Sequence, residues 1–65
     1  MKITLNGTPQ ETGADTLAAL LDEMGYTHAR VATAVNEEFV PAPSRDAHSL
    51  ADGDRIEIVT PRQGG

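Results

Sequence analysis

The sequence predicts one small α+β domain, in which extended segments lie on either side of a single amphipathic helix. Its 65 residues are enough for one compact core. Apolar and polar residues alternate at the start of the chain and again near its end, which is the period of a half-buried strand. Between these segments, apolar residues recur every three and four positions, which is the period of a helix.

The N-terminal segments are expected to form a hairpin. Residues 1–5 carry apolar side chains at the odd-numbered positions, so one face of this strand points to a core. Asn6-Gly7 follows, and this pair favours a tight turn because both residues readily take positive φ. Residues 8–12 should return alongside as a weaker strand, with Pro9 at an edge or irregular position.

The helix is the most clearly marked element of the sequence. Asp15 or Thr16 can cap its N-terminus. Its apolar stripe follows the spacing i, i+3, i+4 and i+7, with Leu17, Leu20, Leu21 and Met24. Gly25 is a natural stop at the position after the C-cap.

The second half of the chain returns to extended structure. Residues 31–36 predict a third strand, residues 36–38 turn it, and residues 39–40 resume a short extended piece that Pro41 and Pro43 end. Residues 44–49 are expected to be a polar loop.

The predicted loop leads into the last strand. Leu50 should anchor the far end of the loop in the core, and Asp52-Gly53-Asp54 is typical of a turn. Residues 55–60 predict the last strand, with Ile56 and Ile58 inward and Val59 outward.

Composition and charge exclude several classes of function. Ten acidic residues against five basic ones give a net charge of −5, and the basic residues are scattered, so neither nucleic acid nor an anionic membrane is an expected partner. Such a body would be steered toward a basic protein surface. We expect no cleavable leader, a cytoplasmic location, and a monomer when the chain is alone.

No interior residues form a convincing catalytic or metal site. His28 and His48 lie twenty residues apart without a nearby cysteine, so surface histidines are the better interpretation. Asp46, His48 and Ser49 are the residue types of a hydrolytic triad, but they are crowded into one polar loop without a scaffold for an oxyanion hole. We therefore expect no metal and no cofactor bound by this chain.

The chain ends in Gln63-Gly64-Gly65, and this end is the candidate functional site. We expect residues 1–60 to form the folded domain and residues 61–65 a flexible tail, which if extended reaches roughly 17 Å. Two glycines can thread a passage too narrow for other residues. The reactive group of such an end is the α-carboxylate of Gly65, which becomes attackable once it is activated as an acyl-adenylate.

Several segments together resemble a known family. ATAVNEEFVP at residues 32–41, LADGDRIEI at residues 50–58 and the terminal diglycine are similar to the thiamine-biosynthesis sulfur carrier family (ThiS-type), which are small ubiquitin-like proteins. The resemblance covers essentially the whole chain. It implies a β-grasp fold, with a mixed four- to five-stranded sheet, one helix packed across one face, and a free C-terminal tail.

The resemblance also implies a mechanism in which the chain is a protein cosubstrate and not an enzyme. A partner E1-like adenylating enzyme, using ATP and Mg, would adenylate the carboxylate of Gly65, the acyl carrier, while Gly64 provides steric clearance. Sulfur, usually from a cysteine desulfurase persulfide, would replace AMP to give a thiocarboxylate. Thiazole synthase would then take that sulfur for the thiazole ring of thiamine.

The resemblance leaves some partners open. Family members often have a basic residue directly after Val-Pro, and here Arg45 is the candidate to take its place. Molybdopterin synthesis, tRNA thiolation and cysteine synthesis are alternative sulfur acceptors. A ubiquitin-like conjugation tag, which would link Gly65 to amines, and a plain interaction module with an idle tail are the alternatives outside sulfur transfer.

Overall fold

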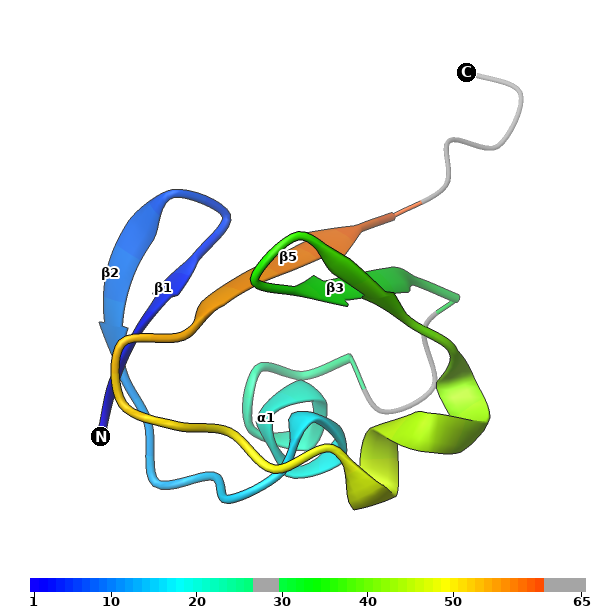
Figure 1. The fold of residues 1–65 in the computed structure, drawn as a ribbon, viewed down its shortest axis with the longest axis horizontal. Coiled ribbons are helices and arrows are strands. Elements are labelled where there is room, and N and C mark those ends of the chain that lie inside the picture. Colours follow the sequence, from blue (N-terminus) through cyan, green and yellow to red (C-terminus); the bar gives the residue numbers. More distant parts are fainter. Residues whose placement is uncertain (27–29, 61–65) are drawn as a thin grey trace.

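The structure is a computed structural model that describes residues 1–26 and 30–60 (Figure 1). Within those residues, five strands form one mixed sheet in the order β2-β1-β5-β3-β4, and helix α1 packs across one face. The elements in chain order are β1 (Lys2–Leu5), β2 (Thr8–Glu11), α1 (Leu17–Glu23), β3 (Ala32–Val35), β4 (Glu38–Val40), the 3₁₀ helix η1 (Ala42–Ala47) and β5 (Arg55–Val59). This is the β-grasp arrangement that the sequence predicts.

Strand β5 occupies the centre of the sheet, with one hairpin on each side. It runs parallel to β1 and antiparallel to β3, and the β3 register extends from Val35 opposite Ile56 to Ala32 opposite Val59. Both hairpin turns contain an asparagine at positive φ, Asn6 at 49° and Asn36 at 51°. The last strand is therefore paired with β3 as far as Val59, and with β1 over its first two residues, Arg55 and Ile56.

The core lies between the sheet and α1, and it is almost entirely aliphatic. The predicted stripe of the helix is inward, since Leu17 and Leu20 are 0% exposed and Leu21 is 5% exposed. From the sheet, Ile56 and Ile58 are buried as the alternation predicts. The remaining buried hydrophobic residues are Ile3, Ala14, Val35, Val40 and Leu50. The predicted periods of the helix and of the last strand are both confirmed.

The ends of α1 follow the sequence signals. Thr16, one of the two candidate caps, takes an extended conformation and its hydroxyl accepts a hydrogen bond from the Ala19 amide at 3.2 Å. After the C-cap residue Met24, Gly25 takes φ of 88°, a conformation that glycine adopts without strain. Within the described residues no helix has the length and apolar character to cross a bilayer.

The expectation of a loop over residues 44–49 is wrong for most of that segment, because residues 42–47 form η1. Pro43 lies in the first turn, where its fixed φ suits a helix, and the Ser44 amide donates to the carbonyl of Pro41 at 2.9 Å. Leu50 is buried at the far end of this segment, as predicted. Its amide donates to the Asp15 carbonyl at 2.8 Å, which ties the segment to the start of α1.

Candidate carrier tail and its docking surface

Gly65, the predicted acyl carrier, and Gly64, predicted to give steric clearance, lie outside the described residues, as does the rest of the 61–65 segment. The structure does describe the strand that leads to them. Val59 ends β5 in register with Ala32 of β3, and the exposed Thr60 follows it. The part of the site that the structure describes is therefore the surface around the end of β5.

An apolar patch lies on the face of the sheet opposite α1, next to the end of β5. Phe39 is 68% exposed and Val59 is 61% exposed. The strand register connects them through two small residues, because Ala34 pairs with Phe39 and Ala32 pairs with Val59. We call these four residues, Ala32, Ala34, Phe39 and Val59, the outer patch.

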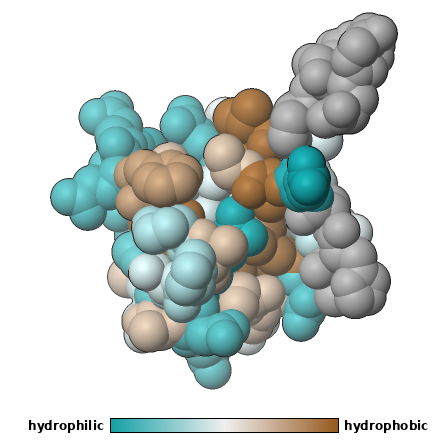
Figure 2. Space-filling view, turned by 90° about the vertical axis from the view of Figure 1, so that its right-hand side faces the viewer, coloured by the Kyte–Doolittle hydropathy of each residue, from teal (hydrophilic) through white to brown (hydrophobic). Residues whose placement is uncertain are grey.

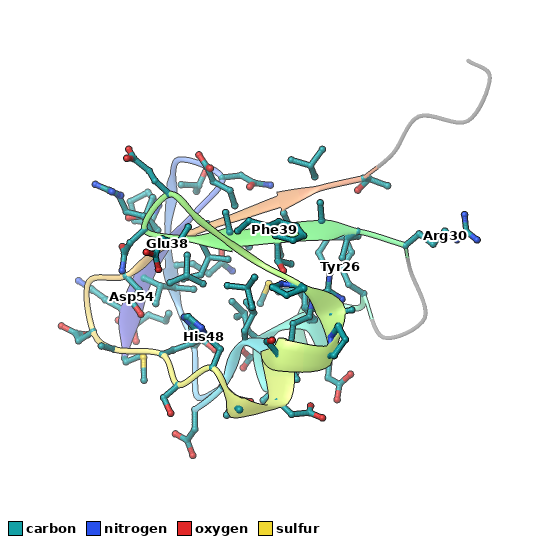
Figure 3. All side chains as sticks on the ribbon, turned by 45° about the vertical axis from the view of Figure 1, so that its right-hand side comes forward. Tyr26, Arg30, Glu38, Phe39, His48 and Asp54 are labelled. Carbon is teal, nitrogen blue, oxygen red and sulfur yellow. The ribbon has the colours of Figure 1, made fainter. Side chains whose placement is uncertain are left out.

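The outer patch has the properties of a recognition surface. Figure 2 views the molecule from the side where β5 ends and shows apolar residues gathered there. In Figure 3, Phe39 lies on the sheet, whereas Tyr26 lies on the side of α1. Phe39 is the chain's single phenylalanine, and exposed aromatic side chains beside other apolar residues typically mark sites of protein contact. The alternation in the last strand predicts that Val59 points outward, whereas no pattern in the sequence singles out Phe39.

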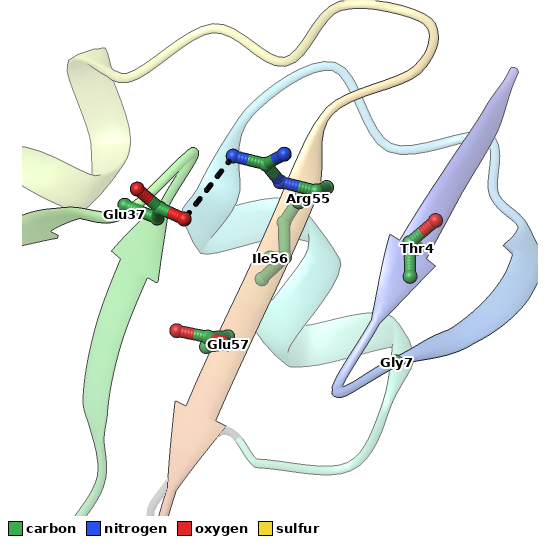
Figure 4. A pocket seen from close by; sticks show the side chains of 6 residues that line it. All are labelled: Thr4, Gly7, Glu37, Arg55, Ile56 and Glu57. Atoms are coloured by element: carbon green, nitrogen blue, oxygen red, sulfur yellow. Dashed lines mark ion pairs between the residues drawn. The ribbon is translucent and has the colours of Figure 1, made fainter.

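The other end of the outer face is polar. Near the start of β5, Arg55 forms an ion pair with Glu37 at 3.7 Å, and both side chains are largely exposed. They line a shallow hollow of about 250 Å³ between the two hairpins, together with Thr4, Gly7, Ile56 and Glu57 (Figure 4). The outer face thus changes from charged to apolar along β5, in the direction of the tail.

Arg45, the candidate for a partner-binding basic residue, makes hydrogen bonds within the domain through its guanidinium group. Its Nε donates to the Thr33 hydroxyl at 3.0 Å and its Nη2 donates to the Val31 carbonyl at 2.7 Å. The Thr33 hydroxyl in turn donates to the Val40 carbonyl at 2.8 Å, and Thr33 is 1% exposed. Arg45 therefore fastens η1 to β3 on the inner side of the sheet, away from the outer patch.

Among the residues that the structure describes, those considered for metal chemistry do not form a cluster of ligands. Among residues 1–26 and 30–60, no three His, Asp or Glu side chains converge as metal ligands. His48 is half-buried, whereas Asp46 and Ser49 are exposed. His28 lies outside the described residues.

Within the described residues, the sheet order, the one α-helix across the sheet and the central last strand define a ubiquitin-like domain. Comparison with known proteins then identifies the family. The ThiS family model matches residues 3–65. Sulfur carrier protein ThiS of Thermus thermophilus is 38% identical over 63 residues, which cover 97% of this chain and 98% of that protein. The chain belongs to the ThiS family, and the predicted class of sulfur carrier is confirmed.

An enzyme also contains a related segment. A thiazole synthase of Paramagnetospirillum magneticum is 39% identical to this chain over 66 residues. The match takes in 100% of this chain but 20% of the synthase, so the chain spans about a fifth of that protein's length.

Solved structures of the family have the same fold. The crystal structure of thiamine biosynthesis protein ThiS from Geobacter metallireducens matches with a TM-score of 0.83 and 30% identity, covering 100% of both chains. An NMR solution structure of a thiamine biosynthesis protein from the same organism gives a TM-score of 0.80 and 29% identity, covering 100% of this chain and 88% of that one. These matches confirm the β-grasp fold.

Proposed function

We propose that this chain carries sulfur as a thiocarboxylate on Gly65 and delivers it to thiazole synthase. The observation that carries the proposal is the full-length match to a sulfur carrier protein, in a chain that ends in a diglycine. The match of the whole chain to part of a thiazole synthase supports that enzyme as the acceptor, in preference to molybdopterin, tRNA or cysteine synthesis.

In the proposed chemistry, the tail is the substrate and partner enzymes supply the catalytic groups. The Gly65 carboxylate attacks the α-phosphate of ATP, with Mg, in an E1-like adenylating enzyme, and pyrophosphate leaves. The terminal sulfur of a cysteine desulfurase persulfide then attacks the acyl carbon and displaces AMP. A second thiol cleaves the resulting S–S bond and is oxidised to a disulfide with the desulfurase cysteine, which leaves the sulfur on Gly65. Gly64 provides clearance because it has no side chain.

The outer patch is the proposed docking surface for the adenylating enzyme. Val59 lies six residues before Gly65 in the sequence. An extended tail of five residues reaches roughly 17 Å. An enzyme that binds the patch can therefore hold its nucleotide within reach of the carboxylate. Apolar contact at Phe39 and Val59 would supply affinity. The acidic charge of the body favours a basic enzyme surface, as the sequence predicts.

The test is the intact mass of the protein before and after incubation with its adenylating enzyme, ATP, Mg and sulfide. We expect a mass gain equal to the exchange of one oxygen for sulfur. The matched control is the chain that lacks Gly65, for which we expect no gain and an unchanged melting temperature, because the predicted tail buries no core. An unchanged mass for the intact chain, with an enzyme shown to be active on another carrier, would contradict the proposal.

A second measurement tests the acceptor. The thiocarboxylate form is mixed with thiazole synthase and its small substrates, and the carrier mass is followed. Return to the carboxylate mass together with formation of a thiazole supports the proposed acceptor. A carrier that keeps its sulfur under these conditions would point to one of the other acceptors. Linkage of the activated carrier to amines of cellular proteins would instead support a conjugation tag.

A further inference from the structure

We propose that Asn6 is a positioning residue for the carrier tail, because its side chain holds the last residues of β5 where the backbone of β1 no longer does. The inference rests on the proposed function, since it concerns how the Gly65 carboxylate is presented to the adenylating enzyme. Asn6 lies in the β1–β2 turn, far from Gly65 in the sequence but beside the strand that leads to it.

The pairing between β1 and β5 is short. It includes Thr4 with Arg55 and Leu5 with Ile56, and the Asn6 amide then donates to the Ile56 carbonyl at 2.9 Å. At Asn6 the chain takes φ of 49° and turns into the hairpin. Strand β5 continues beyond this point, so its edge toward β1 needs another partner.

The Asn6 side chain supplies that partner. Its Oδ1 accepts a hydrogen bond from the Ile58 amide at 2.8 Å, and its Nδ2 donates to the Ile58 carbonyl at 3.1 Å. The carboxamide uses its oxygen as acceptor and one of its two N–H groups as donor, as a peptide group does, so it extends the ladder by one step. Ile58 itself is 5% exposed, and unpaired backbone groups at such a position are costly.

The consequence concerns where the tail begins. With Asn6 in place, β5 is held toward β1 as far as Ile58 and toward β3 as far as Val59. Without that side chain, the hold toward β1 ends at Ile56, two residues earlier. A longer free segment loses more conformational entropy when the enzyme orders it, and it presents the carboxylate from a less defined origin.

Asn36 provides a matched control at the other end of the same strand. It also has positive φ, its Oδ1 accepts from the Arg55 amide at 3.0 Å, and its Nδ2 donates to Asp54 Oδ1 at 3.0 Å. Its contacts therefore hold the start of β5 and leave the end untouched. Replacing either asparagine by glycine keeps the positive φ and removes the side-chain bonds.

The experiment compares Asn6→Gly and Asn36→Gly in the full chain by two readouts. In hydrogen exchange of the isolated carrier, we expect Asn6→Gly to speed exchange of the Ile58 amide about tenfold or more, beyond any change in global stability. With the adenylating enzyme, pyrophosphate release at varied carrier concentration should show a KM for the carrier raised about tenfold and a nearly unchanged kcat. We expect Asn36→Gly to leave that KM within about twofold of wild type.

Three outcomes would overturn the proposal. Asn6→Gly could leave Ile58 exchange at the wild-type rate, could speed it without raising KM, or could raise KM no more than Asn36→Gly does. If Asn6→Gly does not fold, Asn6→Asp takes its place with KM as the readout, because it keeps the acceptor that protects the Ile58 amide and loses only the donor to the Ile58 carbonyl. A KM no higher than that of Asn36→Gly would then overturn the proposal. A wild-type chain that is never adenylated would refute the proposed function, whereas the exchange result would still decide whether Asn6 holds β5.

Discussion

The two faces of the sheet are formed by the same strands but have different roles. The inner face presents Ile56 and Ile58 to α1, and these side chains are almost fully buried. The outer face of the same strand presents Arg55, Glu57 and Val59, all exposed. Because alternate residues point to opposite faces, the chain can fix its fold with one set and leave the other free for recognition. Changes on the inner face should therefore cost stability, and changes on the outer face should cost binding.

The largest effect is expected from Leu20→Ala on the inner side. Leu20 is 0% exposed and packs in the aliphatic core, so its truncation removes buried surface and leaves a cavity. A loss of about 2–5 kcal/mol in the free energy of unfolding is expected for such a change. Urea denaturation, monitored by circular dichroism, measures this loss in the free energy of unfolding.

The control for the Leu20→Ala measurement is a substitution on the outer face. Phe39→Ala removes a larger side chain from the outer face, yet it should change the free energy of unfolding by no more than about 0.5 kcal/mol, because Phe39 is 68% exposed. If the two substitutions destabilised the domain equally, the division of roles between the faces would be wrong.

The inner face was also the part of the fold that the sequence predicted best. Periods of two and of 3.6 residues report burial directly, and they located the stripe of α1 and the inward residues of β5. The two tight turns followed from Asn-Gly chemistry at Asn6 and from the polar run that begins at Asn36. These signals are local, so a single sequence contains them.

The segment that sequence reasoning misjudged depends on a distant contact. Two prolines made helix η1 look like a loop in the sequence, since Pro41 precedes it and Pro43 lies within it. What holds it is Arg45, which reaches the Val31 carbonyl fourteen positions earlier in the chain. No local pattern reports such a bond. The candidate site shows the same division, because the diglycine is visible in the sequence while the outer patch depends on which strands pair.

The second prediction concerns the outer patch. Phe39→Ala and Val59→Thr should each raise the KM of the adenylating enzyme for the carrier, by about tenfold for Phe39, because a buried aromatic anchor typically dominates an interface. The expected change in kcat is small, since neither residue takes part in the proposed chemistry. Initial rates of pyrophosphate release at varied carrier concentration give both constants.

A substitution outside the outer patch tests whether the effect is local. Glu11 is exposed on the edge strand β2, and Glu11→Gln changes the net charge by one unit without altering the patch. We expect its KM to stay within about twofold of wild type. Because Phe39→Ala leaves the net charge unchanged, equal increases in KM for Phe39→Ala and Glu11→Gln would show that the surface bound by the enzyme extends to β2 and is not confined to the outer patch.

The smallest effect is expected at the charged end of the outer face, from Glu37→Gln. The Arg55–Glu37 pair spans 3.7 Å, with side chains 59% and 82% exposed, so solvent screens the attraction and ordering two long side chains offsets it. Its removal should change the free energy of unfolding by less than about 0.5 kcal/mol, in urea denaturation at low and at high salt. The same variant should leave the KM for the adenylating enzyme unchanged, because the pair lies at the end of β5 away from the tail. A raised KM would mean that the enzyme covers the outer face from the outer patch to the hollow, and the two ends of this face would then act as one surface.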